Sequence, residues 1–179
     1  MLGGIGEVEA DIHPNQIALE LAKRFNADSK LLHAPYQVDS MHRKESLITD
    51  KNICEFFKLF DSIDVALMGI GSPLLNTSTL VESGYYTMED IKMLVQQGAV
   101  ADISSLFIDK DGNGDKFEFN KRVIGIDLER IKKIPLTIGI AGAVEKKDAI
   151  LAAIRGKYIK VLIVDEGAEI GRASCRERV

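Results

Sequence analysis

The feature of this sequence that most constrains its fold is an alternation between short apolar runs and amphipathic segments with helical spacing. The runs at 64–69, 136–141 and 160–165 have the length and composition of buried strands. Amphipathic segments, with apolar residues three and four positions apart, separate the runs. Parallel strands need a crossover segment, usually a helix, which lies on a face of the sheet. The sequence therefore predicts an α/β fold: a three-layer, mostly parallel sheet with helices on both faces.

Helix boundary signals support this division of the chain. Pro14 suits the first position of a helix, and Asp50 and Thr87 are residue types that cap helix N-termini. Gly98 and Gly156 are typical helix stops. We also expect strands at 30–34 and 99–108 and an apolar run at 123–126. The apolar faces expected to point inward are Ile17, Ala18, Leu21, Ala22 and Phe25 in the first helix, Ile53, Phe56, Phe57 and Phe60 in the second, Ile91, Leu94 and Val95 in the third, and Ala149, Ile150, Ala153 and Ile154 in the last.

Composition limits the function classes. The chain has 179 residues, of which 46% are hydrophobic, enough for one sizeable core, and we expect a single domain over 1–170. The last residues, 171–179, are basic and aperiodic, so we interpret them as a non-native tail. A net charge of -4 predicts no general attraction to nucleic acid or anionic membranes. Two distant cysteines and the lack of a long apolar run predict a cytoplasmic protein without a membrane span.

The segment 109–120 resembles an EF-hand calcium loop. It has acidic or amide residues at the first, third and fifth positions, including Asp109, and Gly114 at the sixth. However, the twelfth position, which needs a bidentate glutamate, is Asn120, and the eighth is Lys116 instead of an apolar residue. The flanking segments are predicted as strands, whereas an EF-hand loop joins two helices. We therefore expect a hairpin turn here, with a calcium module as a less favoured alternative.

Three loops rich in glycine follow predicted strands or open the chain, at 3–6, 69–72 and 141–146. Glycine lets a backbone approach a ligand, and N–H groups at a helix start attract phosphate. None of the loops has the spacing of a nucleotide-binding motif, and the histidines show no metal-ligand spacing. We predict no metal, no cofactor and no catalytic residue. The candidate ligand-binding residues are Gly3, Gly4, Asn15, Gly69, Gly71, Ser72, Ser83, Gly84, Asp102, Asp109 and Lys146.

Lys146 is the main candidate because it lies in the first turn of a predicted helix, where a cation is disfavoured unless an anion is bound nearby. A phosphate would satisfy this position, and an imine with an open-chain sugar aldehyde is a second use of the amine. The alternative is a solvated lysine beside Lys147. Asp102 is unusual within a strand, which indicates either a site or a solvent-facing position on an edge strand.

Several segments together resemble a known family. Gly3-Gly4, HPNQIALELAKRF, DVALMGIGS, SGYYTMEDIKMLVQQGAVADISSLFIDKDGN, VIGIDLERIKKIPLTIGIAGAVEKKDAILAAIRG and VLIVDE are similar, in order and spacing, to the effector domain of SorC-type sugar-binding bacterial transcription regulators. The resemblance covers almost everything before Gly171. It implies a Rossmann-like fold similar to sugar-phosphate isomerases and CoA transferases. The family's effector loops correspond here to Gly3-Gly4, 69–72, Ser83-Gly84, Asp102 and Lys146. Ala101, Ala143 and Val164 depart from the family pattern.

The resemblance also implies a function. Family members sense a phosphorylated sugar, form dimers or tetramers, and bind operator DNA through an upstream helix-turn-helix domain that is absent from this chain. We therefore expect an effector-binding domain of a bacterial transcriptional regulator, with DNA binding only through the missing domain and no membrane partner. The alternative is a sugar-phosphate isomerase-like or aldolase-like enzyme on the same fold, because a fold does not determine a function.

Overall fold

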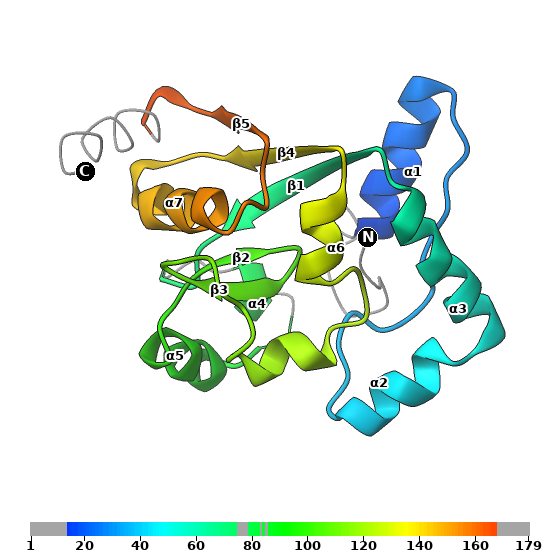
Figure 1. The fold of residues 1–179 in the computed structure, drawn as a ribbon, viewed down its shortest axis with the longest axis horizontal. Helices are drawn as coiled ribbons and strands as arrows, with labels where there is room; N and C mark the ends of the chain where they lie inside the picture. Colours follow the sequence, from blue (N-terminus) through cyan, green and yellow to red (C-terminus); the bar gives the residue numbers. More distant parts are fainter. Residues whose placement is uncertain (1–13, 75–78, 83, 85, 168–179) are drawn as a thin grey trace.

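The computed structural model describes residues 14–74, 79–82, 84 and 86–167, in which a five-stranded sheet is surrounded by helices (Figure 1). The strand order is β3-β2-β1-β4-β5. β1, β4 and β5 are parallel, and β2 is antiparallel to both β1 and β3. The predicted α/β architecture is confirmed. The strands are β1 Val65–Gly71, β2 Ala99–Ile103, β3 Leu106–Asp109, β4 Leu136–Ala141 and β5 Val161–Val164.

Seven α-helices and three short 3-10 helices are found in the described part of the chain. None of the described helices is both long and apolar enough to cross a membrane. The α-helices are α1 Pro14–Phe25, α2 Met41–Ile48, α3 Lys51–Lys58, α4 Thr79–Glu82, α5 Met88–Gln96, α6 Leu128–Lys133 and α7 Lys147–Arg155, and the 3-10 helices are η2 Leu59–Ser62, η3 Glu118–Arg122 and η4 Val144–Lys146.

The predicted helix caps are confirmed. The Asp50 side chain accepts hydrogen bonds from the N–H groups of Asn52 and Ile53, at 2.9 and 3.3 Å. The Thr87 hydroxyl accepts from the Asp90 N–H while the Asp90 carboxylate accepts from the Thr87 N–H, which is a reciprocal capping box. Helix α1 begins at Pro14, as its fixed φ favours. Local side-chain chemistry therefore determines where these helices begin.

The strand predicted over 99–108 is in fact two strands. Ser104 and Ser105 both have positive φ, 49° and 59°, and they turn β2 back into β3. This pair of left-handed residues matches the tight hairpin turn that twisted antiparallel strands prefer. Such turns usually contain glycine or asparagine, so two serines give no clear signal in the sequence. The consequence is that Asp102 lies on β2 directly opposite Gly71 of β1.

Two other predicted strands are wrong. The segment 30–34 contains no strand, although Leu32 and Ala34 are buried. The segment after the 109–116 turn is the 3-10 helix η3 instead of the second strand of a hairpin. Its conformation is held by Asn120, whose side chain accepts from the Phe107 N–H at 2.7 Å and donates to the Phe107 and Gly114 carbonyl oxygens. The side-chain amide of Asn120 therefore fixes η3 to the backbone of β3.

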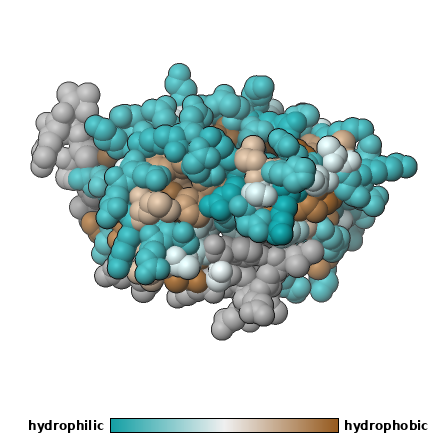
Figure 2. Space-filling view, turned by 90° about the horizontal axis from the view of Figure 1, so that it is seen from below, coloured by the Kyte–Doolittle hydropathy of each residue, from teal (hydrophilic) through white to brown (hydrophobic). Residues whose placement is uncertain are grey.

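The two faces of the sheet differ in their cover. Helix α7, which connects β4 to β5, packs against one face, where Met68, Ile70 and Ile150 are buried (Figure 1). On the other face of β1, β4 and β5, large apolar side chains remain exposed, for example Leu67 and Ile163. The surface seen from below is mostly hydrophilic, with hydrophobic residues in small areas (Figure 2). The inward positions predicted for Ile17, Leu21, Phe25 and Ile154 are wrong, because these side chains are exposed.

Candidate functional site

The carboxyl end of β1 brings a glycine and a carboxylate into direct contact. Gly71 pairs with Asp102 across the β1–β2 ladder. A Cβ atom at position 71 would lie 1.9 Å from Asp102 Oδ1, so the carboxylate can hold this position only beside a glycine. Both residues are among the predicted ligand-binding candidates, and the structure brings them together.

Lys146 reaches the same end of β1 from the start of α7. Its Nζ donates a hydrogen bond to the carbonyl oxygen of Ile70, at 3.1 Å. Burial raises the pKa of Asp102 to about 6, while the charge of Lys146 and the Ser105 N–H act in the opposite direction. An ammonium group and a carboxylate that ionises near neutral pH therefore lie at one strand end, where ligands of open α/β sheets usually bind.

The loop between β4 and α7 has a strained backbone. Ala143 has φ 76° and ψ 141°, a region that glycine adopts far more easily than alanine. Its N–H donates to Asp165 Oδ2 at 2.8 Å, and a Cβ at Gly142 would lie 2.8 Å from the same oxygen. Asp165, just after β5, thus holds the loop that carries Lys146. No role was predicted for Asp165, although a carboxylate directly after a predicted strand was a usable signal.

Ser72 and Gly69 were expected in a loop that contacts the ligand. In the structure, Ser72 is buried and Gly69 lies within β1. Ser72 is buried, and its hydroxyl donates to the Val100 carbonyl and accepts from the Leu74 N–H, both at 3.4 Å. It therefore ties the end of β1 to β2. Gly69 lies inside β1, paired with Ile140, and its Cα faces open space on the exposed side of the sheet. The predicted loop begins three residues later than expected, at Ser72, because β1 extends to Gly71.

The remaining candidates are not gathered at this strand end by the contacts that the structure gives. Asn15 is the second residue of α1, and Gly84, with φ 72°, forms a turn after α4. Gly3, Gly4 and Ser83 lie outside the described residues, as does the predicted tail at 171–179. The candidate site therefore consists of Gly71, Asp102 and Lys146. Asp165 supports the loop that carries Lys146.

A buried tyrosine pair next to this region was not predicted. Tyr36 donates a hydrogen bond to the hydroxyl of Tyr86 at 3.1 Å. The pKa of Tyr86 is raised, first by burial and then by Tyr36 and the nearby charge of Asp102. Tyr86 also makes an edge-on contact with the ring of Phe107, at 5.4 Å between centroids. The tyrosine pair therefore joins an aromatic core to the side of the sheet where Asp102 lies.

Asp109 serves the turn that resembled a calcium loop. Its Oδ1 accepts from the N–H groups of Asp111 and Asn113, at 3.0 and 2.9 Å, and its Oδ2 pairs with Lys116 Nζ at 3.1 Å. Burial alone would raise the pKa of Asp109, but these hydrogen bonds lower it overall. Both oxygens of Asp109 are therefore already directed at N–H donors, two of the backbone and one of Lys116, instead of at a metal ion. The motif also joins β3 to η3 instead of joining two helices, which overturns the calcium interpretation.

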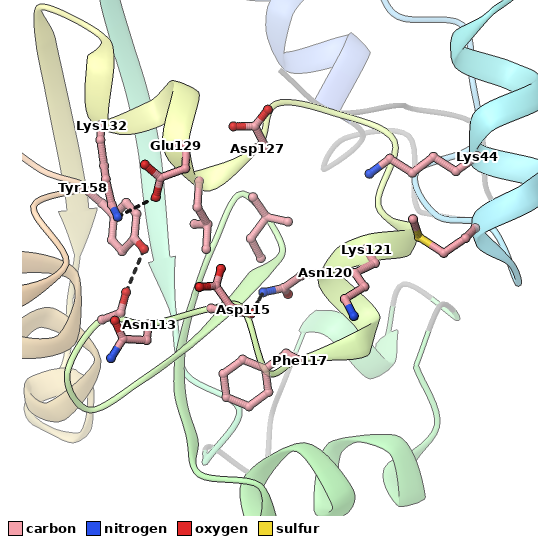
Figure 3. A pocket seen from close by; sticks show the side chains of 15 residues that line it. Lys44, Asn113, Asp115, Phe117, Asn120, Lys121, Asp127, Glu129, Lys132 and Tyr158 are labelled. Carbon is pink, nitrogen blue, oxygen red and sulfur yellow. Dashed lines mark hydrogen bonds and ion pairs between the residues drawn. The ribbon is translucent and has the colours of Figure 1, made fainter.

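The same turn forms one wall of a surface cavity of about 490 Å³ (Figure 3). The Tyr158 hydroxyl donates to the Gly112 carbonyl at 2.7 Å and fixes the turn to the end of α7. Lys44 enters the cavity from α2, and burial lowers its pKa despite the charge of Asp127. The lysines and carboxylates of the lining balance each other, so the cavity favours no charge sign.

Comparison with known proteins identifies the family of this chain. A model for the family described as "Putative sugar-binding domain" matches residues 1–169. The chain is 29% identical to the sorbitol operon regulator of Klebsiella pneumoniae over 94% of its own length and 53% of that protein. It is 29% identical to the deoxyribonucleoside regulator of Bacillus subtilis, covering 92% of the chain and 52% of that protein. The chain thus spans about half the length of these relatives.

Solved structures agree with these similarities. A DeoR family transcriptional regulator from Listeria monocytogenes matches with a TM-score of 0.83 and 37% identity, over 91% of this chain and 63% of that one. The full-length sorbitol operon regulator from Klebsiella pneumoniae matches with a TM-score of 0.86 and 29% identity, over 96% of this chain and 55% of that one. The chain therefore belongs to the sugar-binding domain family found in SorC-type transcriptional regulators.

Proposed function

We propose that this chain is the effector-binding domain of a bacterial transcriptional regulator and that its effector is a phosphorylated sugar. The observation that supports this most is the meeting of Lys146, Asp102 and Gly71 at the carboxyl end of β1 in a member of a sugar-binding family. Both functional groups have chemistry suited to such a ligand. Lysine binds phosphate as a point charge, and a carboxylate accepts hydrogen bonds from sugar hydroxyls.

The geometry suggests which residues would bind the phosphate and which would bind the sugar hydroxyls. Lys146 uses one N–H donor on the Ile70 carbonyl, and an ammonium group has three donors, so donors are left for an anion. The phosphate would lie near the start of α7, where the helix dipole adds partial positive charge. Asp102, on the neighbouring strand, would then accept from a sugar hydroxyl. Gly71, which has no side chain, leaves the room that this carboxylate occupies beside β1.

Regulation would act through parts of the protein outside this chain. The relatives are named as transcriptional regulators, so we propose that a helix-turn-helix domain upstream binds an operator in the cytoplasm and that the whole protein is a homo-oligomer. An effector changes DNA affinity only if it binds two assembly states differently. The chain would bind its sugar phosphate without converting it.

A thermal-shift and calorimetric screen tests the proposal, with phosphorylated sugars paired against the same free sugars. We expect at least one phosphorylated sugar to raise the melting temperature by mass action while its free form does not. Lys146→Ala should abolish the shift at the same ligand concentration. Equal shifts for free and phosphorylated sugars would reject the phosphate-binding role of Lys146.

One observation keeps an isomerase-like activity as the second candidate: Asp102, with a pKa near 6, has the value that suits a general base near neutral pH. The sugar phosphate that stabilises the chain should therefore also be incubated with it and analysed for an isomeric product. A sensor returns the ligand unchanged. Turnover that Asp102→Asn removes would establish the enzyme instead.

A further inference from the structure

One lysine in the described lining of the surface cavity of about 490 Å³ differs from its neighbours. Three lysines line this cavity: Lys44 from α2, Lys121 from η3 and Lys132 from α6. Lys121 forms an ion pair with Glu118, and Lys132 forms one with Glu129 at 2.7 Å. No hydrogen bond or ion pair of the Lys44 ammonium is found within the described part of the chain. Lys44 is therefore the one lysine of the described lining without a direct charge partner.

The position of Lys44 determines the state of its amine. The side chain extends from α2 into the cavity, where it is partly buried (Figure 3). Removal from water disfavours the charged form and lowers the pKa of Lys44, although the charge of Asp127 opposes this shift. In the same cavity, the hydrogen bond to Glu129 raises the pKa of Lys132. At a given pH, Lys44 therefore has a larger fraction of the neutral, nucleophilic amine than Lys132 has.

We propose that Lys44 is a site of covalent modification, at which a small neutral hydroxyaldehyde forms a reversible imine. The electron pair of the neutral amine attacks the carbonyl carbon, and a C–N bond forms. One proton of the nitrogen passes to the oxygen, which gives a carbinolamine. The C–O bond then breaks, the hydroxyl group leaves as water with the second nitrogen proton, and a C=N bond remains. The reaction consumes no oxidant, reductant or other reagent.

The rest of the lining favours a neutral reagent that carries hydroxyl groups. Asp115, Asp127 and Glu129 line the same cavity, and their carboxylates repel an anionic electrophile. Asn113 and Asp115 offer groups that hydrogen-bond to hydroxyls, while Leu128 offers an apolar contact. The cavity volume lies within the range of about 300–1,000 Å³ that is typical of small-molecule sites. A small hydroxyaldehyde therefore suits both the charge and the size of the cavity.

Lys146, the residue for which the sequence suggested an imine, is less suited to this reaction. Its Nζ donates a hydrogen bond to the Ile70 carbonyl oxygen at 3.1 Å. A neutral imine nitrogen has no N–H group, so imine formation would break this bond. Lys121 and Lys132 would likewise lose their ion pairs, whereas Lys44 has no such contact to lose within the described residues. The inference does not depend on the effector proposed above.

Reductive trapping tests the site. The chain is incubated near neutral pH with glycolaldehyde and sodium cyanoborohydride, which reduces each imine to a stable secondary amine. Peptide mass spectrometry then gives the labelling rate of each lysine. We expect Lys44 to be labelled at least about fivefold faster than Lys121 and Lys132 in the folded chain. In guanidinium chloride the three rates should become similar, because the cavity is lost. Similar rates in the folded chain, or slower labelling of Lys44, would overturn the proposal.

A charge variant and a charged reagent test the two parts of the argument separately. Asp127→Asn removes the charge that favours the ammonium form of Lys44, and asparagine caps α6 as well as aspartate does. Lys44 should therefore be labelled faster in this variant, with Lys121 unchanged as the internal control and the fold checked by circular dichroism. Glyoxylate, an anionic aldehyde, should show a smaller preference for Lys44 than glycolaldehyde does. An unchanged Lys44 rate in Asp127→Asn, or an equal preference with glyoxylate, would contradict the proposed site.

Discussion

Two lysine–carboxylate pairs in this molecule have opposite characters. At the 109–116 turn, Lys116 contacts Asp109 directly, and two backbone N–H groups complete the bonding of that carboxylate. At the end of β1, Lys146 donates to a backbone carbonyl, and Asp102 is disfavoured as an anion by burial. The pKa of Asp109 is lowered and that of Asp102 is raised.

This difference separates a structural pair from a candidate binding pair. A carboxylate whose bonds are complete stabilises its own turn and has little left for a ligand. A buried carboxylate beside a lysine with donors left over gains from a ligand that brings hydroxyl and phosphate groups. The sequence motif that looked most functional is therefore structural, and the less conspicuous pair is the candidate site.

The largest effect is expected from glycines in the two regions. Gly112 has φ 85°, and a Cβ there would lie 2.4 Å from the backbone of Gly156, so Gly112→Ala should lower the free energy of unfolding by about 3 kcal/mol. Gly71→Ala meets a side chain that can rotate, and should cost only about 1 kcal/mol but weaken ligand binding. Urea denaturation and calorimetry measure both. Equal losses of stability in the two variants would contradict the expected difference between Gly112 and Gly71.

The second prediction compares the lysines by ligand affinity. Lys146→Ala should weaken binding of the sugar phosphate found in the screen by roughly 10- to 100-fold, the usual worth of a hydrogen bond to a charged group. Lys116→Ala should leave the dissociation constant within about twofold, because its contacts lie within the turn. Titration calorimetry measures the dissociation constant of both variants. A similar loss for Lys116→Ala would move the site to the turn.

The third prediction concerns pH, and the two carboxylates act with opposite sign. Because the pKa of Asp102 in the folded chain is about 6, the folded state binds more protons than the unfolded state between about pH 4 and 6. Its contribution to stability is present below pH 4 and is lost, on the order of 2–3 kcal/mol, as pH rises through 6. Asp102→Asn should remove this loss.

Asp109 provides the opposite comparison in the same titration. Its lowered pKa contributes stability above the usual aspartate value, and this contribution is lost as pH falls through the folded pKa. Asp109→Asn should therefore flatten the acid side of the stability curve only. Unfolding monitored by circular dichroism from pH 3 to 8 gives both slopes, and a single shared slope would show that the two environments do not differ.

The smallest effect is expected at Ala143. Ala143→Gly relieves a backbone conformation that alanine rarely adopts, so the free energy of unfolding should rise by about 1 kcal/mol. Removing the methyl group should also ease the approach of an anion to the Lys146 loop. Ala153→Gly, in the second half of α7, is a control that should destabilise the chain. A destabilised Ala143→Gly variant would argue against strain at this loop.

Sequence patterns predicted the parts of the fold that depend on local chemistry. The caps at Asp50 and Thr87 and the stop at Gly98 need only neighbouring residues, and the existence of strands β1, β4 and β5 follows from composition. The prediction that these strands are buried was wrong for one face of the sheet, where their side chains are exposed. The β2–β3 turn was missed because Ser104 and Ser105 adopt positive φ without glycine. Helix η3 was missed because a distant contact, from Asn120 to Phe107, determines its conformation.

The site was predictable only as separate residues. Gly71, Asp102 and Lys146 were each selected for their type and place along the chain, but their contact depends on strand order, which the sequence does not state directly. Asp109 was selected on the same grounds and belongs to a turn instead, because local N–H groups complete its bonding. Asp165 was overlooked because its role is to hold a loop 22 residues earlier in the chain.

The most direct test of the central claim is a backbone amide NMR titration of the chain with the sugar phosphate selected by the screen. If the effector binds at the end of β1, the amide signals of Gly71, Ser72, Ala143 and Lys146 should shift in proportion to occupancy. The signals of 110–116 should not move. Shifts centred on the 110–116 turn, with the Lys146 loop unchanged, would contradict the account.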